Sequence, residues 1–133
     1  MEIIFVDTSA FLALVQVEEA NHASARNTWK EYLNRGASFV TSNYVIVESV
    51  ALIQNRVGIS FVQQLSDELL SFVETHWVGE DQHHEALNYV LAANRRHLSL
   101  VDCSSFSTMR ELGIQTAFTF DDHFREQGFR VIP

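Results

Sequence analysis

Residues 1–14, MEIIFVDTSAFLAL, hold two apolar runs that are separated by one carboxylate and two hydroxyl groups. The first run, at positions 3–6, is β-branched and aromatic, which is typical of a strand buried on both faces of a parallel sheet. Thr8 and Ser9 are residues that start helices, and the second apolar run continues at helical spacing. Asp7 is therefore predicted to lie between a central strand and a helix, where open α/β sheets place their ligand crevice.

An aspartate at this point has two explanations. It can serve the helix that follows, because the start of a helix has backbone N–H groups that need hydrogen-bond acceptors. It can also belong to a chemical site, provided that other carboxylates occur at matching places. The positions of the remaining acids decide between these explanations.

Strands and helices alternate along the rest of the chain, with polar residues at most helix starts and glycines after several helix ends. This alternation predicts a parallel sheet with helices on both faces. The predicted strands are 3–6, 38–40, 76–78, 117–120 and 129–132, and the predicted helices begin at residue 8 and cover 22–34, 43–57, 60–73, 81–96, 102–112 and 122–127.

Three helix starts carry specific signals. Asn21 is predicted to cap the second helix, and Thr41 or Ser42 the third. Ser60 and Gln63 have the spacing of a capping box for the fourth helix.

The bulk properties indicate one domain over residues 1–133, because 47% hydrophobic residues supply enough apolar surface for one core. No apolar run reaches the length of about 20 residues that crosses a bilayer, and no basic region precedes the first apolar run, so we expect no membrane span and no signal peptide. The single cysteine, Cys103, cannot form an internal disulfide. These features favour a cytoplasmic protein.

The formal net charge of −8 argues against a tight, non-specific nucleic-acid binder, since most of the affinity of such proteins comes from neutralising phosphates. It is compatible with a nuclease whose acidic site is neutralised by metal, and with a protein that has a basic partner chain.

Glu48 is the second acid of interest. In the predicted third helix it shares a face with Tyr44, Ala51 and Leu52, and that face is otherwise apolar. We expect the face to be turned toward the core, where an ionised carboxylate is costly unless it is paired or bound to metal. An ion pair with an arginine, or a place at the edge of the apolar stripe, is the structural alternative.

Two further aspartates repeat the placement of Asp7. Asp102 lies where a helix begins, and its structural alternative is helix capping. Asp121 directly follows a predicted strand; either it or Asp122 is the cap of the short helix, and the other is the candidate ligand.

Acids at strand ends and helix starts, with one on a helix face, can converge on one crevice. Converging carboxylates repel one another unless a cation is present. Oxygen ligands without a histidine or cysteine cluster suit Mg²⁺ or Mn²⁺, which also bind substrate phosphate. The chemistry that fits is hydrolysis of a phosphodiester, in which metal ions activate water and stabilise the leaving oxygen.

Four segments together carry a resemblance to a known family: VDTSAF at 6–11, VES at 47–49, VD at 101–102 and FTFDDHF at 118–124. In order and spacing they resemble the PIN-domain ribonucleases, and in particular the single-domain VapC-type toxins of bacterial toxin–antitoxin pairs. The likeness covers essentially the whole chain. Each segment is short, and the specificity comes from their combination.

The resemblance implies a metal-dependent endoribonuclease with a three-layer α/β/α fold, a five-stranded parallel sheet flanked by helices. It also implies a homodimer held inactive by a small antitoxin. Carried over by position, Asp7, Glu48, Asp102 and Asp121 match the four acids that bind Mg²⁺ or Mn²⁺ and carry catalysis. The hydroxyls that match those orienting the carboxylates belong to Thr8, Ser9 and Thr119.

Other residues have simpler interpretations. His83 and His84 lack the spacing of a zinc pair and are interpreted as surface residues. His123 follows Asp121 by two positions and is interpreted as a solvated helix residue, with contact to phosphate or water as the alternative.

The rival functions fit less well. A receiver-type signalling domain needs an acid pair beside the first strand and a lysine late in the chain, whereas the only lysine is Lys30. A haloacid-dehalogenase-like phosphatase needs a second aspartate at position 9, where Ser9 stands. A non-catalytic PIN-like binding module is the main alternative, and the presence of all four acids argues against it. The carboxylates alone do not distinguish RNA from DNA.

Overall fold

The computed structural model describes all 133 residues, from Met1 to Pro133, as a parallel sheet with helices on both faces. The strands are β1 (Ile3–Val6), β2 (Ser38–Ser42), β3 (Val73–His76), β4 (Thr116–Phe118) and β5 (Arg130–Ile132). The helices are α1 (Thr8–Val15), α2 (His22–Asn34), α3 (Asn43–Arg56), α4 (Ile59–Gln64), a π-helical turn η1 (Leu65–Leu69), a 3-10 turn η2 (Leu70–Phe72), α5 (Glu80–Ala93), α6 (Leu100–Leu112) and α7 (His123–Glu126).

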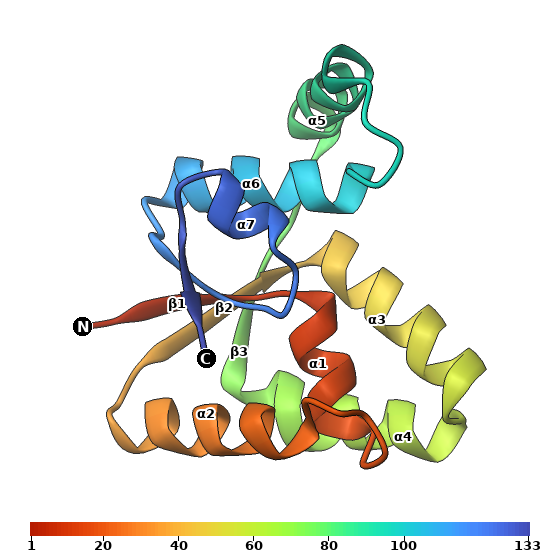
Figure 1. The fold of residues 1–133 in the computed structure, drawn as a ribbon, viewed down its shortest axis with the longest axis vertical. Coiled ribbons are helices and arrows are strands. Elements are labelled where there is room, and N and C mark those ends of the chain that lie inside the picture. The colour runs from red at the N-terminus through yellow and green to blue at the C-terminus, as the bar shows by residue number, and fades with distance from the viewer.

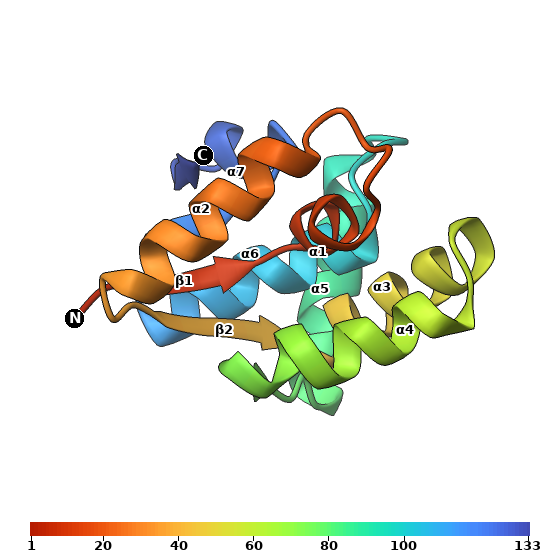
Figure 2. The same cartoon turned by 90° about the horizontal axis from the view of Figure 1, so that it is seen from below.

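The strand order is β3-β2-β1-β4-β5, and every neighbouring pair is parallel. Helices α1, α2 and α4 lie on one side of the sheet, and α5, α6 and α7 lie on the other (Figures 1 and 2). α3 contacts both α1 and α6. The predicted three-layer α/β/α fold with a five-stranded parallel sheet is confirmed.

The centre of the sheet is a topological switch point. After β1, the strands β2 and β3 are added on one side of it. The later strand β4 pairs with the opposite edge of β1. Val6 pairs with Phe118, and the backbone N–H of Asp7 donates to the carbonyl of Phe118 at 3.1 Å. Asp7 and Thr119 are therefore neighbours just beyond the carboxyl ends of the two strands, where open α/β sheets bind their ligands.

The core positions α6 and α7 relative to these strand ends. Phe5 of β1, Phe106 of α6 and Phe124 of α7 are completely or almost completely buried. The rings of Phe106 and Phe124 meet edge to face with centroids 5.0 Å apart, and Phe5 lies 6.5 Å from Phe124. Aromatic packing of this kind fixes the two helices, and with them the acids at their N-terminal ends.

α3 begins directly at the end of β2. The hydroxyl of Ser42 accepts a hydrogen bond from the backbone N–H of Val45 at 3.2 Å, so Ser42 is the cap and Thr41 is not. The hydroxyl of Thr41 instead donates to the carbonyl of Val6 at 2.8 Å. This bond joins β2 to the end of β1, one residue before Asp7.

The prediction that Asn21 caps α2 with its side chain is wrong. The backbone angles of Asn21, φ −90° and ψ 5°, are not the extended angles that direct a capping side chain toward the helix. The amide of Asn21 instead donates to Glu19 at 3.4 Å.

The predicted capping box of Ser60 and Gln63 is also wrong. The cap position is taken by Gly58, whose φ of +123° is a conformation that favours glycine, so α4 begins at Ile59 and Ser60 lies inside its first turn. The amide of Gln63 donates to Asp67 at 2.8 Å.

The predicted helix 60–73 is not continuous, because α4 gives way to η1 and η2. Leu65 and Leu69 of η1 are buried. The π-turn alters the helical period, and Phe72 is consequently 57% exposed.

The third strand was predicted at 76–78, but β3 occupies Val73–His76. The helical turns end at Phe72, which lets the strand begin earlier. Trp77 then lies outside the sheet and is exposed, and the backbone N–H of Val78 donates to the side chain of Asn43. None of the helices has the length and apolar character that crossing a bilayer requires.

We predict that Ser42→Ala lowers the free energy of unfolding by about 1 kcal/mol, because it leaves the buried N–H of Val45 without its acceptor. The matched control is Ser60→Ala at the exposed residue of α4, which is expected to change stability by less than about 0.5 kcal/mol. Urea unfolding followed by circular dichroism measures both. Equal losses in the two variants would contradict the assignment of the cap to Ser42.

Candidate active site

Asp7 is the buried centre of the site, with 4% of its surface exposed. It occupies the N-cap position of α1, yet its side chain makes no capping hydrogen bond. Two hydroxyls bind one of its oxygens instead: Ser9 donates to Oδ2 at 2.9 Å and Thr119 at 2.8 Å. Helix capping therefore does not explain Asp7, and the hydroxyls hold its carboxylate in one orientation.

Burial raises the pKa of Asp7 from 3.8 to about 6. The hydrogen bonds from Thr119 and Ser9 oppose this rise, and the charge of Asp102 adds to it. The negative charge of Asp7 is thus poorly compensated by the protein alone, because two hydroxyl donors do not replace the water that burial removes.

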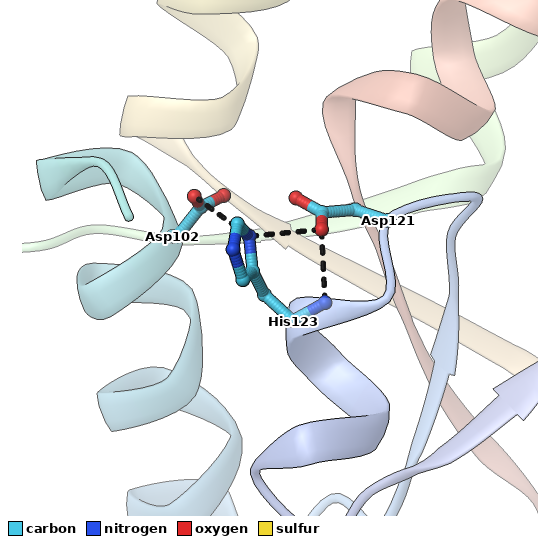
Figure 3. A group of neighbouring side chains, drawn as sticks. All are labelled: Asp102, Asp121 and His123. Carbon is cyan, nitrogen blue, oxygen red and sulfur yellow. Dashed lines mark hydrogen bonds and ion pairs between the residues drawn. The ribbon is translucent and has the colours of Figure 1, made fainter. Parts of the chain in front are cut away.

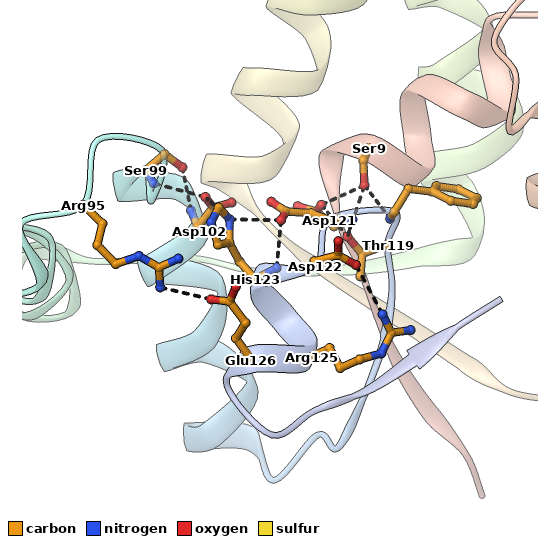
Figure 4. A network of polar contacts seen from close by, with 12 residues as sticks. Ser9, Arg95, Ser99, Asp102, Thr119, Asp121, Asp122, His123, Arg125 and Glu126 are labelled. Carbon is orange, nitrogen blue, oxygen red and sulfur yellow. Dashed lines mark hydrogen bonds and ion pairs between the residues drawn. The ribbon is translucent and has the colours of Figure 1, made fainter.

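Ser9 and Thr119 connect Asp7 to the loop between β4 and α7. The backbone N–H of Phe120 donates to the hydroxyl of Ser9 at 2.9 Å, and that of Asp121 donates to the hydroxyl of Thr119 at 3.0 Å (Figure 4). The same two hydroxyls therefore orient Asp7 and set the course of the loop that carries Asp121.

Asp102 lies in the first turn of α6 and has two roles in the geometry. It forms a capping box with Ser99: the N–H of Ser99 donates to Oδ2 of Asp102, and the N–H of Asp102 donates to the hydroxyl of Ser99, both at 3.0 Å. Burial raises the pKa of Asp102, the hydrogen bonds with Ser99 lower it, and the charge of Asp121 raises it again. Capping accounts for one oxygen of Asp102, but not for the placement of its charge beside Asp121.

The structure distinguishes the adjacent aspartates at the start of α7. The side chain of Asp121 is 29% exposed; it accepts a hydrogen bond from the N–H of His123 and faces Asp102 (Figure 3). The side chain of Asp122 is 89% exposed and pairs with Arg125 at 3.2 Å. Asp121 is thus the member of the pair that joins the acidic group.

His123 also belongs to this group, although the sequence favoured a solvated role for it. Its Nδ1 lies 2.9 Å from Asp121 and 3.8 Å from Asp102 (Figure 3). The side chain is only 17% exposed. Its position two residues after Asp121 was the sequence signal for a role at the site. Only the path of the chain into α7 shows that the ring points back to the acids.

Glu48 is placed differently from the prediction. The buried stripe of α3 consists of Val45, Ser49 and Ile53, whereas Glu48 is half-buried on the neighbouring face. The expectation that its face is turned to the core was wrong, because α3 is apolar on several sides and the sequence pattern does not single out one. No hydrogen bond or ion pair joins Glu48 to Asp7, Asp102 or Asp121, so its part in the site stays a prediction.

Thr8 likewise does not make the contact expected of it. Its hydroxyl is buried and has no hydrogen-bond partner, so it orients none of the carboxylates in this structure. Ser9 and Thr119 do make the expected contacts with Asp7.

The donor set fits a divalent cation. Ligand-type atoms of Asp102, Asp121 and His123 lie within 4.8 Å of one another, and the charge of Asp102 acts on Asp7. The buried Nδ1 of His123 has no hydrogen-bond partner. Several carboxylates in one place are stable together when a cation neutralises them, and oxygen-rich sites of this kind suit hard cations.

A separate groove of about 690 Å³ lies between α5 and α6. Its lining includes Gln82, Tyr89, Cys103 and Arg110, and none of the four predicted acids. The candidate site at the strand ends is therefore distinct from this groove.

A parallel five-stranded sheet with acids gathered at its central switch point defines the class of this protein, and comparison with known families agrees. The PIN domain family matches residues 4–130, so the chain belongs to the PIN domain family.

The similarity extends to particular toxins. The chain is 34% identical over 127 residues to the 23S rRNA-specific endonuclease VapC20 of Mycobacterium tuberculosis, covering 95% of each protein. The crystal structure of that VapC20, described as a sarcin–ricin loop cleaving toxin, superimposes with a TM-score of 0.87 over 98% of this chain and 99% of the other, at 33% identity. The chain is thus a homologue of VapC-type ribonuclease toxins.

Two more distant structures share the fold. VapBC2 from Rickettsia felis, bound to a DNA fragment from its promoter, matches with a TM-score of 0.71 at 15% identity, covering 97% of this chain and 96% of the other. FitAcB from Neisseria gonorrhoeae matches with a TM-score of 0.68 at 12% identity, covering 98% and 96%.

We predict that Asp7→Asn stabilises the metal-free protein near neutral pH. The folded-state pKa of Asp7, about 6, exceeds its ordinary value of 3.8, so between these values the folded protein binds more protons than the unfolded chain. The contribution of Asp7 to the free energy of unfolding therefore falls as pH rises from about 4 to 6 and stays low above that.

Asparagine retains an oxygen that can accept from Ser9 and Thr119 but carries no charge. We expect a gain of about 1–3 kcal/mol at pH 7.5 that disappears near pH 4. Urea unfolding in EDTA at both pH values measures it, with the exposed Asp122→Asn as control. A variant that is less stable than the wild type at pH 7.5 would contradict the cost assigned to the buried charge.

Proposed function

We propose that this chain is a metal-dependent endoribonuclease of the VapC type that acts as a single domain over residues 1–133. The observation that carries the proposal is the gathering of Asp7, Asp102 and Asp121 at the switch point between β1 and β4. Membership of the PIN family and the similarity to VapC20 support the same activity.

The three aspartates would hold Mg²⁺ or Mn²⁺, and Glu48 on α3 would complete the acidic set. When bound, the ions supply Lewis acidity that lowers the pKa of an attacking water and stabilises the leaving oxygen of the phosphodiester. The chain's own residues prepare this chemistry. Ser9 and Thr119 keep Asp7 in one orientation, so the carboxylate does not need to reorganise when substrate arrives.

The helix starts contribute to substrate binding. α1 begins beside Asp7, and α6 begins beside Asp102. The N-terminus of a helix carries partial positive charge and favours phosphate, which offsets part of the repulsion between acids and the RNA backbone. Neutralisation by bound cations would complete this compensation in a chain of net charge −8.

Ribosomal RNA is the first substrate class to test. VapC20, which shares 34% identity over 95% of this chain, is a 23S rRNA-specific endonuclease. Because the similarity extends over nearly the whole of both chains, it supports a similar RNA-binding surface. We therefore propose a structured loop of 23S rRNA as the target. Such a substrate requires a cytoplasmic protein.

We further propose that the chain forms a homodimer and is held inactive by an antitoxin. Large apolar side chains that a partner could cover are exposed on several elements: Val47 on α3 is 70% exposed, Trp77 is 74% exposed, and Leu91 on α5 is 69% exposed. VapC20, to which this chain is 34% identical, is described as a toxin, which supports an inhibitory partner of this kind. Light scattering on the purified chain tests the dimer.

The cleavage test uses antitoxin-free protein, purified ribosomes and total RNA with Mg²⁺ or Mn²⁺. We predict discrete metal-dependent fragments that EDTA abolishes. Asp7→Asn and Asp121→Asn are each expected to lower the cleavage rate about 10²-fold or more, since each removes a charge that holds the ion.

The matched control is Asp122→Asn, which changes the neighbouring aspartate on the same loop and is expected to stay within about twofold of wild type, because its side chain is 89% exposed and faces Arg125. Cleavage that resists EDTA, or equal losses in the Asp121 and Asp122 variants, would contradict the proposed site. A folded, metal-loaded wild type that cleaves no RNA would favour a non-catalytic binding module.

A further inference from the structure

The imidazole of His123 lies among the acids rather than in solvent. Its Nδ1 is 2.9 Å from Oδ1 of Asp121 and 3.8 Å from Oδ2 of Asp102 (Figure 3). The next residue, Phe124, is fully buried against Phe106, which anchors the start of α7. The ring is therefore held in place by the core and not by a flexible segment.

Nδ1 of His123 is buried, and its contact with Asp121 at 2.9 Å lacks the geometry of a hydrogen bond, so the nitrogen has no hydrogen-bond partner in the protein. The oxygen 2.9 Å away, Oδ1 of Asp121, already accepts a hydrogen bond from the backbone N–H of His123. Buried polar atoms without partners are rare, because they lose contact with water and gain no replacement. With its proton on Nε2, the ring presents a lone pair at Nδ1, which a cation can bind.

The spacing of the three side chains suits one ion. Adjacent ligand atoms of an octahedral ion with bonds of about 2.1 Å lie about 3 Å apart, and opposite ones about 4.2 Å apart. The distances from Nδ1 of His123 to Asp121 and Asp102 are 2.9 and 3.8 Å, and all three ligand atoms lie within 4.8 Å of one another. Small side-chain movements would bring them to a common centre.

We propose that Nδ1 of His123, together with Asp102 and Asp121, binds one divalent ion directly, and that this nitrogen makes the position favour Mn²⁺ over Mg²⁺. The inference rests on the proposed nuclease function and adds a ligand to the acids assigned there. Mg²⁺ strongly prefers oxygen, whereas transition-metal ions accept imidazole more readily. His123 is thus the residue that determines the choice of metal.

The first experiment requires no mutation. Metal-free full-length protein, prepared with and without ¹⁵N-labelled histidine, is loaded with one equivalent of Mn²⁺ and studied by electron spin-echo envelope modulation. We expect a ¹⁴N coupling from a directly bound nitrogen, and we expect it to change to the ¹⁵N pattern in the labelled protein. This readout is independent of catalysis.

Variants then identify which histidine supplies the coupled nitrogen. His123→Gln is expected to lose the coupling and to bind Mn²⁺ about tenfold or more weakly, as measured by calorimetry. Loss of an outer-shell partner already lowers metal affinity by about tenfold or more, and a direct ligand should matter at least as much. Its Mg²⁺ affinity is expected to change by less than about threefold, because glutamine offers an oxygen that Mg²⁺ accepts. The control, His84→Gln, changes an exposed histidine of α5 and should retain the coupling and both affinities.

The outcomes separate this inference from the proposed function. Mn²⁺ that binds without nitrogen coupling, or a His123→Gln variant that retains coupling and affinity, overturns the role of His123 and leaves the nuclease proposal standing. A wild type that binds neither Mn²⁺ nor Mg²⁺ overturns both. If His123→Gln fails to fold, as judged by circular dichroism, the ¹⁵N-histidine spectrum of the wild type still decides whether a histidine binds the ion.

Discussion

The candidate site is organised around one buried charge, the carboxylate of Asp7 at the end of the central strand. Pairing of β1 with β4 brings Thr119 beside it, and the turn into α1 brings Ser9 to the same oxygen. These two hydroxyls orient the carboxylate without neutralising it, and burial raises its pKa to about 6. The fold thus retains an unfavourable group at the place where ligands bind in open α/β sheets, which is the expected mark of a functional site.

The groups next to Asp7 are also in electrostatically unfavourable surroundings. The charge of Asp121 raises the pKa of Asp102, and Nδ1 of His123 is buried without a hydrogen-bond partner. Each of these features is explained by a divalent cation, which would neutralise the acids and bind the nitrogen. The aromatic contacts of Phe106 and Phe124 hold α6 and α7 in register, so the apolar core determines how closely the acids approach.

The sequence predicted the order of strands and helices, because buried strands and helix starts leave local signals, and it predicted Asp7 and Asp102 as site residues for the same reason. It did not resolve Asp121 from Asp122, since only the path of the loop after β4 decides which side chain faces inward. The face of Glu48 was mispredicted because α3 is apolar on several sides. The position of His123 depends on the packing of α7, which no local pattern encodes.

The central claim is that these acids form a cation site, and the most direct measurement is a crystal structure of the chain with Mn²⁺, with the metal located by anomalous scattering. We predict an anomalous peak bounded by Asp7, Asp102 and Asp121, with Ser9 and Thr119 still on Oδ2 of Asp7. At saturating Mn²⁺, the absence of a peak there, with the three carboxylates in their present positions, would contradict the account.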